Sequence, residues 1–263
     1  MQEVGPSVWL FSAPQIRWEV LRDFLREVDP RAEQAADRMQ GVISDGEALV
    51  ETAGRECYRS WVPEINPNVT QIREDSEAYL RNILSSGHGS VLQHANYTFI
   101  LHNVSRVFTH EMVRHTAGVS VSQESMRFVR LTDIPFWFPE WAREDADLMS
   151  RSMNLLRLME SHQEWMATRF GLDDPGVPFA EKKHKTSFMR RFAPEGVATG
   201  MVCTMNIRAL RHIIYMRTAL GAEEEIRVVF DKVAQICQQE FPHLMQDYSP
   251  NEWLEWIPEF LKV

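Results

Sequence analysis

The sequence predicts an α+β fold in which helices outnumber strands. Two observations support this fold class: apolar residues recur at helical spacing along most of the chain, and the few strand-like segments are separated by helices in no regular order. A parallel α/β sheet would instead require strands and helices in steady alternation. At 263 residues the chain is long enough for one large domain or two small ones.

The first half of the chain contains clear helical and strand patterns. Helical spacing of apolar residues predicts three helices, over residues 15–28, 44–55 and 75–86. Alternating apolar residues then predict a strand over 95–103. Ser105 is placed to cap a helix that ends near His115, and residues 126–131 are a further candidate strand.

The second half begins with a loop rich in proline and aromatic residues at 133–141, the best candidate for a domain boundary or an insertion. A long helix is expected over 145–170, with an apolar stripe that we assign to the core: Leu148, Leu155, Leu156, Met159 and Met166. Alternation predicts a strand over 194–205, and helices follow at about 206–219 and 222–240. The last aromatic residues are expected to pack onto the body of the protein: Trp253, Trp256 and Phe260.

The composition is that of an ordinary globular protein, with 44% hydrophobic and 25% charged residues. The net charge of −9 argues against non-specific nucleic-acid binding, which requires a basic surface. Cys57, Cys203 and Cys237 are far apart and indicate no disulfide framework. We see no signal peptide and no stretch of roughly 18 apolar residues, so we expect a cytoplasmic protein without a membrane span.

The most informative segment is residues 114–127, which follows the helix expected to end near His115. It combines arginines, a histidine, serines, an amide and a carboxylate. Arginine binds phosphate through a planar and permanently charged group, and the backbone amides and hydroxyls of a turn add neutral donors. The segment therefore predicts an anion-binding site, with a solvated basic loop as the alternative.

This segment resembles the signature of the flavin-dependent thymidylate synthases, which consists of Arg-His-Arg, a spacer, a serine and a further arginine. Arg114, His115, Ser125 and Arg127 match the signature, whereas Thr116 stands where the family has its second arginine. Three other blocks resemble family motifs in the family's order along the chain: residues 53–58, 86–99 and 206–217.

The resemblance implies an antiparallel sheet flanked by helical bundles, formed by a single domain over residues 1–263. It implies methylation of dUMP to dTMP, with FAD as the cofactor and methylenetetrahydrofolate and NADPH as co-substrates. It also implies a homotetramer in which subunits share their sites, with residues 123–127 reaching a neighbour's ligand.

The resemblance also implies roles for individual residues. Those expected at FAD are His88, Ser90, Arg114, His115, Thr116, Gln123, Asn206, Arg208 and His212. Those expected at dUMP are Glu111, Arg114, Gln123, Glu124, Ser125, Met126, Arg127, Arg190 and Arg217. Arg217 is the catalytic candidate, because its fixed charge would favour loss of the imide proton of the pyrimidine and so activate the ring.

Some of these residues have simpler interpretations. His88 is also placed to stabilise the C-terminus of a helix, and Arg190 lies in a basic run, 182–191, that is typical of a solvated surface. We expect Arg211 to be an exposed charge. No G-x-G-x-x-G sequence follows a strand, so a dinucleotide must be held by another arrangement than a Rossmann site.

A metal site is not expected. His110 and His115 are five residues apart, whereas the zinc protease motif needs two histidines four apart on one helix face. Glu111 and His115 do share a helix face. None of the cysteines has the flanking proline found in the folate-only thymidylate synthases, as expected if hydride from a reduced flavin replaces a thiol nucleophile.

Two other functions stay open at this point. Thr116 removes a positive charge near FAD, and Gly89 and Gln93 replace two carboxylates of the family pattern. The protein could therefore be a paralogue that modifies another pyrimidine nucleotide or adds a hydroxymethyl group. It could also bind flavin or nucleotide without turnover, although the retained arginines argue against a complete loss of activity.

Overall fold

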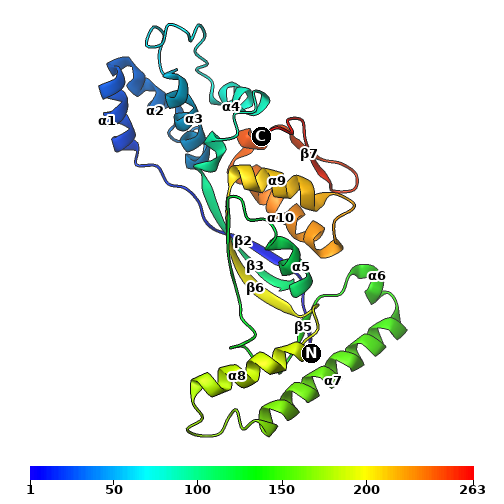
Figure 1. Ribbon diagram of the computed structural model, residues 1–263. Helices are drawn as coiled ribbons and strands as arrows, with labels where there is room; N and C mark the ends of the chain where they lie inside the picture. Colours follow the sequence, from blue (N-terminus) through cyan, green and yellow to red (C-terminus); the bar gives the residue numbers. More distant parts are fainter.

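A four-stranded antiparallel sheet runs through the middle of the protein (Figure 1). The computed structural model describes residues 1–263. Its helices are α1 (Trp18–Val28), α2 (Gln34–Met39), α3 (Asp45–Tyr58), α4 (Ser76–Ser85), α5 (Arg106–Met112), α6 (Glu140–Arg143), α7 (Ala146–Arg169), α8 (Phe179–Met189), α9 (Ile207–Thr218) and α10 (Glu224–Glu240). Its strands are β1 (Gln2–Glu3), β2 (Ser7–Ser12), β3 (Asn96–Ser105), β4 (Val119–Gln123), β5 (Pro135–Phe136), β6 (Ala198–Asn206), β7 (Tyr248–Pro250) and β8 (Trp256–Pro258).

The strands of the main sheet lie in the order β2-β3-β6-β4, and every neighbouring pair is antiparallel. The strands predicted at 95–103 and 194–205 are confirmed as β3 and β6, which pair with each other along their whole length. The strand predicted at 126–131 is wrong, because those residues form turns. The edge strand β4 lies immediately before them instead and pairs with β6.

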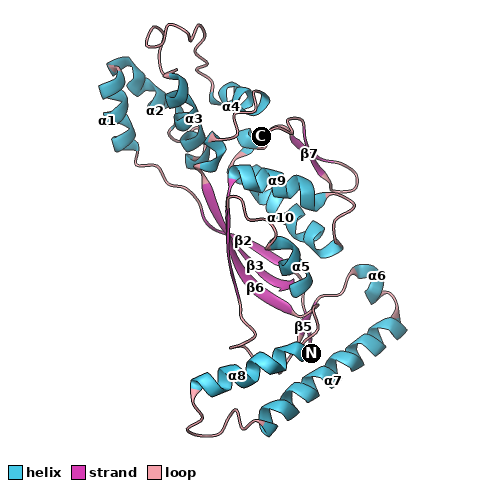
Figure 2. Ribbon diagram, viewed as in Figure 1, coloured by secondary structure: helices cyan, strands magenta, loops and turns pink.

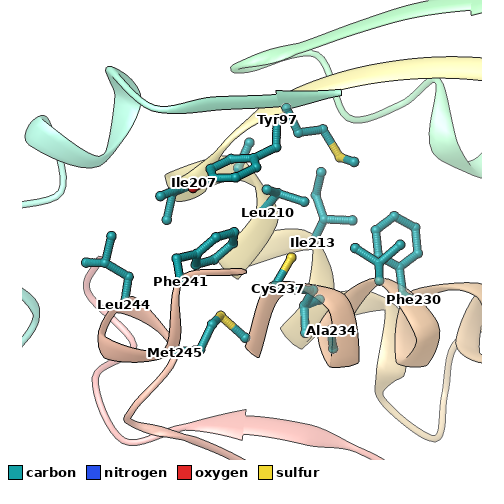
Figure 3. Close-up of a cluster of buried hydrophobic side chains, with 14 of the residues drawn as sticks. Tyr97, Ile207, Leu210, Ile213, Phe230, Ala234, Cys237, Phe241, Leu244 and Met245 are labelled. Carbon is teal, nitrogen blue, oxygen red and sulfur yellow. The ribbon is translucent and has the colours of Figure 1, made fainter. Parts of the chain in front are cut away.

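The main core lies between one face of this sheet and helices α9 and α10 (Figure 3). Tyr97 of β3, Leu210 and Ile213 of α9, and Phe230 and Phe241 at or after α10 are all almost fully buried there. Alternation along the strand places Tyr97 on this inner face, whereas the neighbouring Thr98 is only half-buried. Burial of these large side chains fixes α9 against the sheet, and α9 carries much of the candidate site.

Side-chain caps determine where the functional helices begin. The Ser105 hydroxyl accepts a hydrogen bond from the backbone N–H of Phe108 at 3.0 Å, which confirms it as the cap of α5. The Asn206 side chain accepts from the N–H of Ala209 at 2.9 Å and caps α9. Ser105 and Asn206 are the last residues of β3 and β6, so each helix starts directly from a central strand.

Helices α7 and α8 form a separate layer at the other end of the sheet (Figure 2). The long helix predicted at 145–170 is confirmed as α7, but its apolar stripe is only partly core. Leu156 and Met166 are buried, whereas Leu148 and Leu155 are exposed. The proline- and aromatic-rich loop contains β5 and leads into α6.

The end of the sequence packs against α9 and α10. Trp256 is buried and donates a hydrogen bond from Nε1 to Asp231 of α10, and Phe260 packs against the main core. The packing predicted for Trp253 is wrong, because this side chain is 57% exposed. None of the helices combines the length and apolar character that crossing a membrane requires.

Candidate functional site

Arg217, near the end of α9, contacts Glu111 in the last turn of α5 and His115, which lies three residues after that helix ends. Its Nη1 donates to Oε2 of Glu111 at 2.6 Å, and its Nε donates to Nε2 of His115 at 2.8 Å. The prediction that Glu111 and His115 share a helix face is wrong, because α5 ends at Met112 and His115 lies beyond the helix. The structure therefore brings a guanidinium, a carboxylate and an imidazole together in one partly buried cluster.

His115 is neutral in this cluster near pH 7. Burial lowers its pKa from 6.5 to about 4, and electrostatic interactions with Arg217, His212 and Arg114 act in the same direction. The ring of His212, on the same helix as Arg217, lies edge-on to that of His115 with 6.5 Å between centroids. A neutral His115 accepts the hydrogen bond from Arg217 and so orients the guanidinium without competing with it for an anion.

A pocket of about 590 Å³ opens beside this cluster, at the N-terminal end of α9. Its lining comes from four separate parts of the chain: Gln93, Ala117, Gly118, Asn206, Arg208, Ala209, His212, Leu261, Lys262 and Val263. Arg208 and His212 are one helical turn apart and both face the pocket. Three of the residues expected at FAD, Asn206, Arg208 and His212, thus lie together.

Two glycines allow the chain to approach this pocket closely. Gly118 has a φ of +70°, and a Cβ there would come within 2.3 Å of Nδ2 of Asn206. At Gly89 a Cβ would lie 3.0 Å from Nε of Arg208, a tight contact that the Arg208 side chain would have to relieve by moving. The glycine that replaces a family carboxylate at position 89 therefore leaves its space to the Arg208 side chain.

His88 lies in a different pocket from Asn206 and Arg208. This cavity of about 240 Å³ is lined by residues of α3, α4 and the loop between them, including Arg55, Tyr58 and Arg73. The His88 ring contacts Tyr58 edge-on at 5.6 Å, and its buried Nδ1 has no hydrogen-bond partner. Helix α4 ends at Ser85, and the Ile83 carbonyl in its last turn accepts a hydrogen bond from the backbone N–H of His88 at 3.1 Å rather than from the imidazole.

The segment expected at dUMP runs from α5 to the α7–α8 layer. Gln123 donates from Nε2 to the Thr109 hydroxyl of α5 at 3.1 Å, and Glu124 accepts from the N–H of Gly200 in β6 at 3.3 Å. Further on, the Arg127 carbonyl accepts from Thr186 of α8 at 2.8 Å. The chain thus crosses from one layer to the other within a few residues.

Arg190 lies at this second layer. It borders a small cavity together with Met126, and its side chain is exposed. Ser125 accepts a hydrogen bond from the N–H of Arg127 at 3.4 Å, and Nε of Arg127 is buried without a partner. Within one chain no hydrogen bond or ion pair links Ser125, Arg127 or Arg190 to Arg217.

Arg114, Thr116 and Ser90 are exposed around the cluster and the pocket. Arg114 and Thr116 flank His115, and Thr116 directly precedes Ala117 in the pocket wall. Ser90 precedes a short 3₁₀ turn that ends at Gln93, another pocket residue. These exposed side chains are accessible to a ligand, in contrast to the buried residues around them.

The prediction that Arg211 is an exposed charge is wrong. This side chain is 1% exposed, and its Nη1 and Nη2 donate to the two carboxylate oxygens of Asp247 at 2.7 and 2.8 Å. It lies on the core side of α9, whereas Arg208 lies on the pocket side. Arg211 is therefore a structural residue beneath the site.

The cysteines offer no reactive thiolate to this cluster. Burial raises the pKa of Cys203, in the middle of β6, to about 12, and it raises the pKa of Cys237 in α10 as well. Cys57 is exposed at the end of α3. A nucleophilic cysteine is therefore not part of the chemistry that the Arg217 cluster supports.

Sequence reasoning missed part of the pocket wall. Leu261, Lys262 and Val263 line it, although they lie more than fifty positions after Arg208. Nothing in the local sequence around Lys262 signals a ligand site. Gly118 was within the segment 114–127 but carried no assignment, and only its positive φ and its contact with Asn206 reveal its role.

The arrangement suits a large anionic ligand beside a smaller one. The pocket at the start of α9 offers Arg208 and Lys262, with no aspartate or glutamate among its lining residues. The neighbouring cluster offers a guanidinium held by a carboxylate and a neutral imidazole. Such a guanidinium stabilises negative charge on a ligand without losing a proton itself.

Comparisons with known proteins agree with this arrangement. Residues 39–243 match the family model described as thymidylate synthase complementing protein, a range that includes all four motif blocks. The flavin-dependent thymidylate synthases of Mycobacteroides abscessus and Mycobacterium tuberculosis are each 36% identical to this chain, over 190 and 185 residues. Each alignment covers 69% of this chain and 71% of the relative.

A solved structure shares the fold at lower identity. The UMP/dUMP methylase PolB from Streptomyces cacaoi, in a crystal structure with 5-Br dUMP, superposes with a TM-score of 0.60 and is 17% identical. The match covers 93% of this chain and 95% of that one. The predicted α+β fold with its antiparallel sheet is thereby confirmed.

Proposed function

The chain belongs to the flavin-dependent thymidylate synthase family, and from this premise we propose that it converts dUMP to dTMP with FAD, methylenetetrahydrofolate and NADPH. The observation that carries the proposal is the contact of Arg217 with both Glu111 and His115 beside a cation-lined pocket. The family is one of methyltransferase enzymes that use a flavin. Family membership indicates a flavin, whereas the choice of FAD as that flavin and the identities of the carbon donor and the electron donor belong to the proposal.

The residues around the start of α9 fit a flavin dinucleotide. The pocket combines a volume of about 590 Å³ with two cationic side chains and no acidic side chain, which suits a diphosphate joined to two ring systems. Asn206, Arg208 and His212 would hold FAD from α9, and Arg114, His115 and Thr116 would face it from the segment after α5. When bound and reduced, the flavin would supply hydride to the pyrimidine carbon.

Arg217 would bind the pyrimidine of dUMP. Arg217 lies near the end of α9, between roughly one and three turns beyond His212, Arg208 and Asn206, so a pyrimidine bound there would lie beyond the flavin on the same helix. The fixed positive charge would stabilise the ring after loss of its imide proton. Glu111 holds the guanidinium from one side and the neutral His115 from another, so Arg217 is oriented before a ligand arrives.

We propose that the remaining dUMP contacts come from another subunit of a homotetramer. Met126, Arg127 and Arg190 lie at the α7–α8 layer, whereas Gln123 and Glu124 bond to α5 and β6, and no hydrogen bond links any of them to Arg217. The sheet face opposite the main core supports association, because it carries exposed apolar side chains: Trp9, Phe11 and Val202. Light scattering tests the assembly, and a fully active monomer at all concentrations would contradict it.

A second candidate is the modification of another pyrimidine nucleotide or the transfer of a hydroxymethyl group. It rests on the three departures Thr116, Gly89 and Gln93, two of which touch the flavin pocket in this chain. Gln93 lines the pocket, and Gly89 contacts Arg208 there. Gly89 and Gln93 thus lie at the pocket proposed for FAD rather than at Arg217, which favours dUMP methylation as the first candidate.

The test is a reaction with nucleotide labelled with tritium at the pyrimidine carbon that receives the methyl group. Purified protein is incubated with FAD, NADPH, methylenetetrahydrofolate and either dUMP or UMP, and each component is omitted in turn. We expect tritium release from dUMP that requires all components, and a product with the mass of dTMP. A hydroxymethyl product, or release from UMP alone, would support the second candidate, and no release from either would contradict both.

A further inference from the structure

The flavin pocket carries an unusual charge for this protein. The chain has a net charge of −9, yet the residues that line the pocket include Arg208 and Lys262 and neither aspartate nor glutamate. No hydrogen bond or ion pair engages the charged end of either side chain within the protein. Two unpaired cations that face one cavity indicate an anionic ligand.

The base of the Lys262 residue packs against the turn at Gly87, which keeps this residue at the pocket. Its Cβ and carbonyl oxygen lie 3.6 and 3.9 Å from the position that a Cβ on Gly87 would occupy. Gly87 has a φ of +71° and ends the turn that precedes His88 and Gly89. The closing segment, residues 259–263, therefore lies on the Gly87 turn and forms one wall of the pocket.

The buried Arg211–Asp247 pair anchors this closing segment. The backbone N–H of Phe260 donates to Oδ2 of Asp247 at 3.3 Å, and the N–H of Glu259 donates to the Asp247 carbonyl at 2.9 Å. Asp247 is in turn fixed by two hydrogen bonds from Arg211 of α9. Helix α9 thus offers Arg208 to the pocket directly and positions Lys262 through its opposite face.

We propose that Lys262 binds the diphosphate of the flavin dinucleotide together with Arg208. In this role it supplies the positive charge that the segment 114–127 lacks at Thr116. Thr116 precedes Ala117, which lines the same pocket as Lys262, so a cation from either position reaches one cavity. The inference rests on the proposed binding of FAD and adds a residue to it from outside the motif blocks.

The experiment measures FAD affinity by quenching of flavin fluorescence for Lys262→Met and Lys262→Arg. Methionine keeps the unbranched stem on the Gly87 turn and removes the charge. Lys183→Met is the matched control, because Lys183 lies over Phe128 near α8 and away from the pocket. We expect Lys262→Met to bind FAD about tenfold more weakly, equivalent to about 1.4 kcal/mol, and Lys262→Arg and Lys183→Met to bind like wild type.

Salt and a compensating variant separate a charge effect from a packing effect. The difference in affinity between wild type and Lys262→Met should shrink as salt rises from about 0.05 to about 0.5 M, because salt screens the charge. Thr116→Arg should restore affinity in the Lys262→Met background. An unchanged FAD affinity for Lys262→Met, or a loss that neither salt nor Thr116→Arg alters, would overturn the role of Lys262. Absence of FAD binding by the wild type would instead overturn the proposed function as well.

Discussion

Arg217 of α9 and Glu111 of α5 form an ion pair with 2.6 Å between Nη1 and Oε2. The pair joins a helix that starts at the end of β6 to a helix that starts at the end of β3. Both side chains are only partly buried, so a ligand can reach the guanidinium while Glu111 holds it. The two central strands therefore position the residue on which the proposed chemistry depends.

Protonation of His115 is expected to destabilise the protein in acid. The folded-state pKa of about 4 lies below the ordinary value of 6.5, so the unfolded state binds more protons between these values. The stability contributed by neutral His115 is present above pH 6.5 and is lost as the pH falls towards 4. Because the ring is only half-buried, we expect roughly 1 kcal/mol.

This effect is measured by thermal melts of wild type and His115→Gln between pH 7 and pH 4. Glutamine keeps an oxygen that accepts from Arg217 but does not titrate. The wild type should lose about 2–4 °C more than the variant over this range. Parallel melting curves for the two proteins would show that His115 is not held neutral.

Gly118→Ala should disturb the start of α9. The new methyl group would lie 2.3 Å from Nδ2 of Asn206, in a backbone conformation with positive φ, and it would displace the cap of the helix. We expect a loss of about 1–3 kcal/mol in the free energy of unfolding, together with weaker flavin binding.

Gly41→Ala provides the matched control for Gly118→Ala. Gly41 has a φ of +73°, but nothing lies within 4 Å of the position of its Cβ, so this variant reports backbone strain alone. Chemical denaturation of both variants measures the difference. Equal losses of stability, with flavin binding intact in both, would show that the contact between Gly118 and Asn206 is unimportant.

Two arginines three residues apart on α9 should behave in opposite ways. Arg211→Ala leaves Asp247 buried without its partner and should cost about 3–5 kcal/mol of stability. Arg208→Ala removes an exposed side chain from the pocket and should weaken FAD binding with little change in the melting temperature. Melts and flavin titrations of both variants check the assignment, and a stable Arg211→Ala protein would refute it.

Local chemistry was sufficient to predict much of the fold. Ser105 and Asn206 are typical capping residues, and the alternation in β3 and β6 reflects one buried face, so these elements were expected from the sequence. The edge strand β4 was missed because its pairing depends on β6, which lies about eighty positions later. Residues 126–131 have a strand-like composition but form turns, and the Arg127 carbonyl in this segment accepts a hydrogen bond from Thr186 of α8.

The candidate site depends on contacts between residues far apart in the sequence, which the spacing of residues along the chain does not predict. Helical spacing predicted a shared face for Glu111 and His115, but α5 ends at Met112, and both residues instead contact Arg217 of α9, about a hundred positions later. Arg211 appeared exposed because its partner Asp247 is 36 positions away. Lys262 reaches the pocket only because that same pair anchors the closing segment.

The most direct test of the account is the turnover of Arg217→Ala and Arg217→Lys. If Arg217 stabilises negative charge on the pyrimidine, the alanine variant should lose about 100-fold or more in kcat, and lysine should rescue it only in part. FAD affinity should stay within about threefold of wild type, because its expected contacts lie at Asn206, Arg208 and His212. Turnover, dUMP affinity, FAD affinity and thermal melts are measured on the same preparations. An alanine variant that is folded, binds FAD and turns over dUMP at nearly the wild-type rate would contradict the account.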